Sequence, residues 1–347
     1  MNEKAFTPMS RLLTALSFRE PDRVPFFLLL TMHGAIELGI PIKDYFSKAA
    51  NVIEGQLRMR KKYRHDCFYT FFYAPIEVEA MGGEVFYRED GPPNSGKPLI
   101  NKWEEIEKLS PPPVADAPCL QKVIEATKGL KKEVGNDVPI IGVVMSPFSL
   151  PVMQMGFEKY IHFLYEQPRL FEQLMTINEN FCTEWANAQL EAGATAICYF
   201  DPVSSITIIP KEKYLETGFK VAKRTIARIN GPTATHMASG LCLPIVDELI
   251  ESGTNVIGVS ALENLESLKK NCRKKLAILG NLNGIEMRRW TEEETERIVK
   301  ETIKKGAPGG GLILSDNHGE IPWQIPEEVL LAISNAVHKW GKYPISI

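Results

Sequence analysis

Residues 195–205 read TAICYFDPVSS, an apolar run of strand-forming residues that leads directly into an acid, a proline and two serines. Nearly continuous apolar strands are typical of parallel sheets, because helices cover both faces of such sheets. In parallel α/β folds the carboxyl ends of the strands carry the binding groups. This stretch therefore predicts a buried parallel strand with Asp201 at its functional end.

The same pattern recurs eight times along the 347 residues, each apolar run being followed by a segment with helical periodicity. Eight β-then-α units predict an α/β fold with a single (β/α)8 TIM barrel, one domain over residues 1–347. An open doubly wound sheet is the alternative, but no GxGxxG motif follows the first strand. The expected strands are 24–30, 67–73, 139–144, 195–200, 233–236, 255–259, 276–279 and 311–314, and the expected helices are 42–63, 120–134, 169–191, 211–229, 243–251, 265–274, 292–304 and 326–340.

Two stretches interrupt this alternation. Residues 74–113 are rich in turn-forming residues and predict a hairpin near 85–87, and residues 145–157 form a second long connection. Both follow strands, so in a barrel they are expected at the C-terminal face as extended loops over the active site.

Composition narrows the range of functions. Lys and Arg total 40 against 43 Asp and Glu, a net charge of −3, which argues against nucleic acid and membrane surfaces as partners. No apolar run is long enough to span a bilayer, and the N-terminus lacks a signal-peptide pattern, so a cytoplasmic location is expected. The six cysteines form no CxxC pair, which is typical of reduced thiols and indicates no zinc ribbon.

The residues just after the expected strands are the candidates for function. His236 and His318 are two of only six histidines, and they lie near Asp201 and Glu263 if the barrel forms. Such groups hold a metal ion or exchange protons, although polar residues at a barrel mouth also cap helices and bind loop backbone. Tyr73 and Asn281 are predicted substrate contacts.

Six short motifs together resemble the uroporphyrinogen decarboxylase superfamily. Members are single (β/α)8 barrels, which agrees with the strand count. The motifs are RLLTALSFREPDRVP (11–25), EAMGG (79–83), DPVSS (201–205), NVIG (255–258), LGNLN (279–283) and LSDNHGEIP (314–322).

Two branches of this superfamily compete. The decarboxylases carry an arginine-rich segment resembling RQAGRY that binds the substrate's carboxylates, whereas residues 28–36 here read LLLTMHGAI. Without arginine there is little cationic complement for a polycarboxylate. The sequence resembles more closely the corrinoid-dependent methyltransferases, which include methylcobalamin:coenzyme M methyltransferases and the methyltransferase components of O-demethylases.

The resemblance also implies a zinc site. The coenzyme M enzymes bind zinc through a His-x-Cys and a later Cys; here His236 is kept, Ala238 replaces the first cysteine and His318 stands near the second. Glu263 is the expected third ligand. Such a harder site would activate an ether oxygen or an amine rather than a thiol. The alternative is that no metal binds, and that His318 and Asp201 act by hydrogen bonding or proton transfer.

The predicted function is methyl transfer between a small methylated substrate, such as a methoxyarene, amine or thiol, and the cobalt of methylcobalamin. No DxHxxG motif is present, so a partner corrinoid-binding protein would carry the cofactor. Asp201, His236 and His318 are the predicted catalytic residues. The alternatives are a decarboxylase of the uroporphyrinogen type and a non-catalytic barrel that binds a corrinoid protein.

Overall fold

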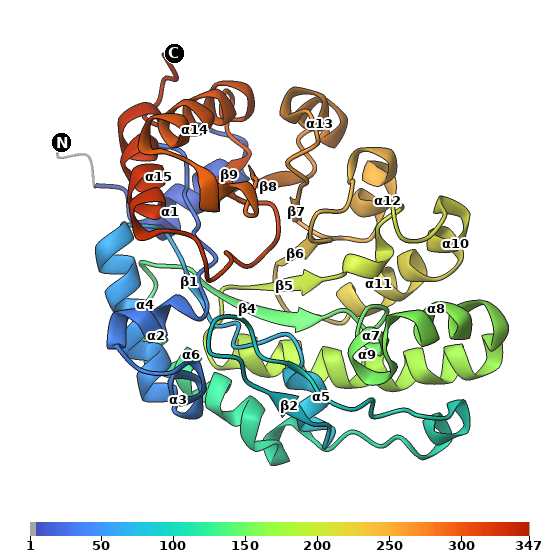
Figure 1. Cartoon of the computed structure of the whole chain (residues 1–347). Coiled ribbons are helices and arrows are strands. Elements are labelled where there is room, and N and C mark those ends of the chain that lie inside the picture. The colour runs from blue at the N-terminus through green and yellow to red at the C-terminus, as the bar shows by residue number, and fades with distance from the viewer. Residues whose placement is uncertain (1–4, 347) are drawn as a thin grey trace.

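A curled parallel sheet forms the centre of the computed structural model, which describes residues 5–346. Its seven strands follow one another in sequence order, and every neighbouring pair is parallel. Helices surround the sheet, as Figure 1 shows. The strands are β1 (Phe68–Tyr69), β4 (Ile140–Met145), β5 (Ala196–Phe200), β6 (Thr233–His236), β7 (Val256–Gly258), β8 (Ala277–Leu282) and β9 (Leu312–Asp316).

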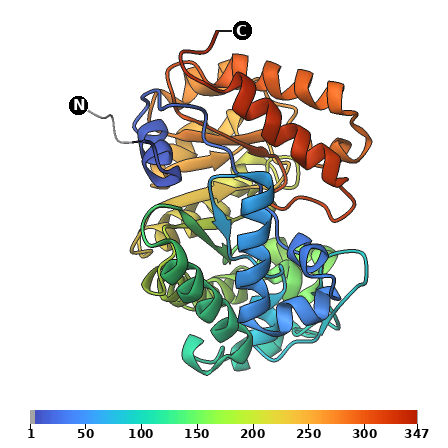
Figure 2. The same cartoon turned by 90° about the vertical axis from the view of Figure 1, so that its left-hand side faces the viewer.

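The helices lie largely where the periodicity predicts them. Helices α14 and α15 pack against each other, α4 packs against α6, and α15 also contacts α4, so the four are neighbours in the layer around the sheet (Figure 2). The α-helices are α1 (Pro8–Leu16), α2 (His33–Leu38), α3 (Ile42–Ser47), α4 (Ala49–Tyr63), α5 (Ile76–Ala80), α6 (Pro118–Val134), α7 (Pro151–Met155), α8 (Phe157–Glu166), α9 (Pro168–Glu191), α10 (Lys211–Glu216), α11 (Gly218–Ile226), α12 (Val246–Glu251), α13 (Leu265–Cys272), α14 (Glu292–Gly306) and α15 (Glu327–Trp340).

The first expected strand, residues 24–30, is not a regular strand. It makes a single parallel bridge, Phe26 with Leu314 of β9, and the amide of Asp66 donates to the carbonyl of Phe26 on its other side. The segment therefore lies between β9 and β1 and makes the sheet barrel-like. Pro25 has no N–H to give to a ladder, which accounts for the irregular pairing.

The second expected strand is also shorter than predicted, since β1 holds only two residues. The backbone amide of Met145, at the end of the neighbouring β4, donates a hydrogen bond to Oε1 of Glu77 at 3.0 Å instead of to a carbonyl of β1. A side chain of α5 thus replaces the backbone partner that a longer β1 would have supplied.

Both long connections contain regular structure. In the first, α5 precedes an antiparallel pair, β2 (Val85–Phe86) with β3 (Asn94–Ser95), which confirms the predicted hairpin. The second contains α7. The expected helix 42–63 is interrupted at Lys48, whose backbone is extended (φ −136°, ψ 133°). Within residues 5–346, no helix combines the length and the apolar character needed to cross a membrane.

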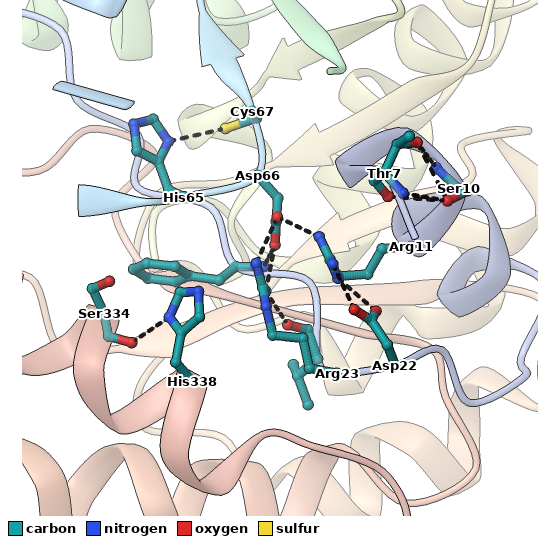
Figure 3. Close-up of polar contacts among 12 residues, drawn as sticks. Thr7, Ser10, Arg11, Asp22, Arg23, His65, Asp66, Cys67, Ser334 and His338 are labelled. Atoms are coloured by element: carbon teal, nitrogen blue, oxygen red, sulfur yellow. Dashed lines mark hydrogen bonds and ion pairs between the residues drawn. The ribbon is translucent and has the colours of Figure 1, made fainter. Parts of the chain in front are cut away.

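The amino ends of the strands are tied together by buried ion pairs. Asp66, just before β1, accepts from Arg11 at 2.8 Å and from Arg23 at 2.6 Å, and it also accepts from the backbone amide of Phe26 at 2.9 Å. Arg11 reaches from α1 and also pairs with Asp22, as Figure 3 shows. These arginines therefore serve the end of the sheet opposite the candidate site.

Candidate functional site

A cavity of about 190 Å³ lies at the carboxyl ends of the strands. Tyr69, Val143 and Phe200 contribute to its wall from β1, β4 and β5, and the loop after β9 supplies the other side. None of the lining residues is a Lys or an Arg. They are Tyr69, Phe71, Ala74, Val143, Phe200, His318, Gly319 and Glu320.

A second, smaller cavity of about 60 Å³ lies deeper among the strands. Its wall includes apolar side chains such as Phe27, Leu29 and Ile313, together with Leu12 of α1. Tyr69 lines both cavities, and its hydroxyl donates to the carbonyl of Gly319 at 2.8 Å. This hydrogen bond fixes the ring to the loop after β9.

His318 lines the larger cavity, as the sequence predicts for a functional residue. Burial lowers the pKa of His318, so the ring is neutral near pH 7. Its Nδ1 is buried and has no hydrogen-bond partner within the part of the chain that the structure describes. A neutral imidazole can donate a hydrogen bond to a ligand through one ring nitrogen and accept one through the other.

His236 lies behind the cavity wall. It is fully buried, its Nδ1 accepts from the amide of Ala238 at 3.1 Å, and its ring lies 5.8 Å from that of Phe200. Burial lowers the pKa of His236 to about 3, and the nearby His318 adds to this effect. A Cβ at Gly258 would lie 2.2 Å from the ring, so the glycine makes room for it. The structure therefore brings the two histidines near each other, with only His318 lining the cavity.

Two carboxyl groups that are not among the predicted site residues lie at the end of β9 and in the loop that follows it. Asp316 accepts from the amides of His318 at 2.7 Å and Gly319 at 3.0 Å, and burial raises its pKa to about 6. Glu320 lines the cavity and accepts from the hydroxyl of Thr31, and burial raises its pKa to about 7. The motif LSDNHGEIP contains both acids, but its residues do not reveal which side chains face inward.

Asp201 does not line this cavity. Its carboxylate accepts from three buried serine hydroxyls: Ser146 at 2.5 Å, Ser149 at 2.6 Å and Ser204 at 2.6 Å. Burial raises the pKa of Asp201, and these three hydrogen bonds oppose the shift. The residue thus joins the loops that follow β4 and β5, a positioning role closer to the capping alternative than to proton transfer.

The three remaining predicted site residues are engaged elsewhere. Glu263 accepts from the backbone amides of Cys242 at 2.9 Å and Leu243 at 2.6 Å. The side-chain amide of Asn281 donates to the carbonyl of Ser260 at 2.9 Å. The hydroxyl of Tyr73 donates to Glu79 at 2.6 Å. None of the three lines the cavity.

The predicted zinc ligands do not fit a zinc site. Structural and catalytic zinc sites use at least three protein ligands arranged around the ion. Among residues 5–346, no three His, Cys, Asp or Glu side chains converge in this way, and Glu263 binds backbone amides instead. The expected set of His236, Glu263 and His318 is therefore not assembled.

A barrel-like parallel sheet with a cavity at the carboxyl ends of its strands is typical of α/β enzymes. The sequence model described as uroporphyrinogen decarboxylase (URO-D) matches residues 7–340. The chain belongs to this family, which confirms the superfamily resemblance of its motifs.

Curated relatives and solved structures agree with this assignment. The uroporphyrinogen decarboxylase of Mannheimia succiniciproducens is 26% identical over 86% of each chain. That of Nitrosospira multiformis is 24% identical over 76% of this chain and 73% of its own. A methyltransferase from Methanosarcina mazei has a similar structure, with a TM-score of 0.84 and 22% identity over 96% of this chain and 99% of its own. At that identity the likeness shows a shared fold.

Proposed function

We propose that this protein is a methyltransferase that moves a methyl group between a small molecule in the 190 Å³ cavity and a corrinoid held by a partner protein. The cavity is the observation that carries the proposal. It is smaller than the roughly 300–1,000 Å³ that enclose drug-sized ligands, and its lining has no cationic side chain. The fold shared with the Methanosarcina mazei methyltransferase supports the same reaction class.

The residues of the cavity suit binding and orientation. Tyr69, Phe71 and Phe200 pack against the apolar part of the substrate, and the imidazole of His318 forms a hydrogen bond with it. Asp316 holds the backbone of His318 and Gly319, so it positions the imidazole. A reduced corrinoid supplies a nucleophile for methyl groups when its carrier protein is bound. No step is assigned to zinc, because the donor set does not fit it.

Decarboxylation of a tetrapyrrole is the second candidate, because the curated relatives are uroporphyrinogen decarboxylases. That substrate carries many carboxylates, which call for guanidinium groups in the site. Residues 28–36 contain no arginine, and Arg11 and Arg23 are committed to Asp66 at the other end of the sheet. These observations favour methyl transfer.

The two reactions are separated by assaying the purified protein in parallel. One set contains cob(I)alamin with methoxyarenes, methylated amines or methylated thiols, and the other contains uroporphyrinogen without corrinoid. We expect methylcobalamin to form with at least one methyl donor, and the rate to fall in His318→Ala. Loss of carboxyl groups from uroporphyrinogen, with no methyl transfer from any donor, would overturn the proposal.

A further inference from the structure

One acidic side chain without a cationic partner on the protein lines the cavity, and a second acid binds the backbone of the same loop. Glu320 lines the cavity, and Asp316 lies directly beneath the same loop, where it holds the amides of His318 and Gly319. Neither carboxylate takes part in an ion pair among residues 5–346, and no Lys or Arg lines the cavity. Buried carboxylates are normally paired with a cation or neutralised, because removing their hydration is costly.

Aromatic rings form much of the remaining wall. Tyr69, Phe71 and Phe200 line the cavity, and the rings of Tyr69 and Phe71 lie 5.9 Å apart at 47° to each other. The faces of aromatic rings carry partial negative charge and attract cations, and cages of such rings recognise methylated ammonium groups. The acid and the rings thus favour the same kind of ligand.

We infer that the cavity binds a methylated ammonium ion, and that this ion is the methyl donor of the reaction proposed above, on which the second part of the inference rests. The ligand supplies the positive charge that the lining of the cavity lacks. Glu320 faces the cationic head, and Phe71 and Phe200 contact its methyl groups.

The chemistry of the donor agrees with the groups available. When the methyl group leaves, the C–N bond breaks and its electron pair stays on nitrogen, so the cation departs as a neutral amine. The new bond to the methyl carbon takes its electron pair from the reduced corrinoid of the partner protein. The departing amine needs no proton, so the site requires no acid for this step.

Other donor classes fit less well. A methoxyarene with a carboxylate would place its negative charge near Glu320 and Asp316 with no cation to offset it. A neutral ether or thioether would gain only the apolar contacts of the rings. A quaternary ammonium gains those contacts and also the attraction of the acid and the ring faces.

The test compares two ligands of the same shape. Choline and 3,3-dimethyl-1-butanol differ in having nitrogen or carbon at the branched centre, so the difference in their affinity measures the effect of the charge. Isothermal titration calorimetry with the full chain at pH 8 is expected to show choline binding about tenfold more tightly than the neutral alcohol. Equal affinities for the two ligands would overturn the inference.

Variants locate the binding site. Glu320→Gln is expected to remove most of the preference for choline while leaving the affinity for the neutral alcohol unchanged. Phe71→Leu is expected to weaken choline more than the alcohol. Glu286→Gln is the matched control, since Glu286 lies in the loop after β8 and outside the cavity. Thermal unfolding checks that each variant is folded. If Glu320→Gln does not fold, Phe71→Leu still tests the assignment of the site. A full preference for choline in both variants would contradict the assignment.

The same experiment separates the two proposals. Methyl transfer from a methoxyarene, with no binding of choline or tetramethylammonium, would refute this inference and leave the methyltransferase proposal intact. Tight binding of choline that depends on Glu320, with no methyl transfer from any methyl donor to cob(I)alamin, would refute the methyltransferase proposal and leave the ammonium site standing.

Discussion

The hydroxyl of Thr31 donates a hydrogen bond to the carboxylate of Glu320, which lies 289 residues away in the sequence. The pair joins the irregular segment between β9 and β1 to the loop after β9. Thr31 lies within residues 28–36. This stretch corresponds to the arginine-rich segment, resembling RQAGRY, that the decarboxylases carry. In this chain the stretch therefore anchors an acid at the cavity rather than presenting cations to a substrate.

Thr31→Val is expected to destabilise the protein more at high pH than at low pH. Burial raises the pKa of Glu320 to about 7, and the Thr31 hydroxyl opposes that shift, so its removal raises the pKa further. Above pH 7 the variant removes a hydrogen bond to an ionised carboxylate, which lowers the free energy of unfolding by about 2 kcal/mol. Below pH 7 it removes a hydrogen bond to a neutral carboxyl group, which lowers that free energy by about 1 kcal/mol. Urea unfolding at pH 5.5 and pH 8.5 measures the difference. Thr31→Ser keeps the hydroxyl and serves as the control; equal losses in the two variants would contradict this role.

Glu77→Gln is expected to stabilise the protein at pH 8. Burial raises the pKa of Glu77 from 4.5 to about 7, so the folded state binds the proton more tightly than the unfolded state. Stability from this group is therefore present at low pH and is lost as the pH rises from about 4.5 to about 7. Glutamine stays neutral and keeps an acceptor for the amide of Met145.

The gain in the free energy of unfolding is expected to be up to about 3 kcal/mol at pH 8 and less than about 1 kcal/mol at pH 5. Urea unfolding at both pH values measures it. Glu133→Gln, on the exposed face of α6, is the control and should change little at either pH. A gain of the same size at pH 5 would show that ionisation is not its cause.

Asp201→Asn is expected to lower stability by about 2 kcal/mol, because the amide nitrogen that replaces one carboxylate oxygen cannot accept a hydrogen bond from a serine hydroxyl such as that of Ser204. Ser149→Ala removes one of the three serine donors and should cost less, about 1 kcal/mol. Choline affinity is expected to persist in folded Asp201→Asn, since Asp201 does not line the cavity. Lost affinity at unchanged stability would restore Asp201 as a substrate-contacting residue.

Asp66→Asn is expected to cost about 3–5 kcal/mol, because it leaves Arg11 and Arg23 without their shared buried partner. Denaturant unfolding gives the free energy. The comparison is Glu54→Gln, which breaks an exposed pair with Arg58 and should cost no more than about 0.5 kcal/mol. Similar losses in the two variants would mean that burial adds nothing to the Asp66 cluster.

Metal analysis of the untagged protein is expected to find less than one zinc per chain, with no change in His236→Ala or His318→Ala. The reason is geometric, since Glu263 is held by backbone amides and no three suitable donors converge within residues 5–346. If one zinc per chain is found and is lost in both variants, the protein forms a set of zinc ligands that the structure does not bring together.

The sequence predicts the central strands well because their patterns are local. Residues 233–236 form β6 as expected, and the runs at 139–144 and 195–200 become β4 and β5 with shifts of one residue at most. The errors come from contacts between distant residues. Nothing near residue 70 indicates that Glu77 will bind the amide of Met145 and so replace part of β1.

The candidate site was predicted in part for the same reason. His318 follows a strand and does line the cavity, whereas Asp201, Glu263 and Asn281 also follow strands and bind neighbouring loops instead. Position at a strand end places a residue on the correct face of the sheet. The direction of its side chain depends on partners such as Ser149 and Cys242, which the strand pattern does not identify.

The ring of Tyr69 is the common wall of the two cavities, and its hydroxyl is held by the carbonyl of Gly319. Because both linings share this residue, we expect it to limit how far a molecule in the 190 Å³ cavity can reach toward the 60 Å³ cavity. A smaller residue at this position would open one longer chamber with an apolar end. We therefore expect the length of the ligands that this protein accepts to change when this side chain is made smaller.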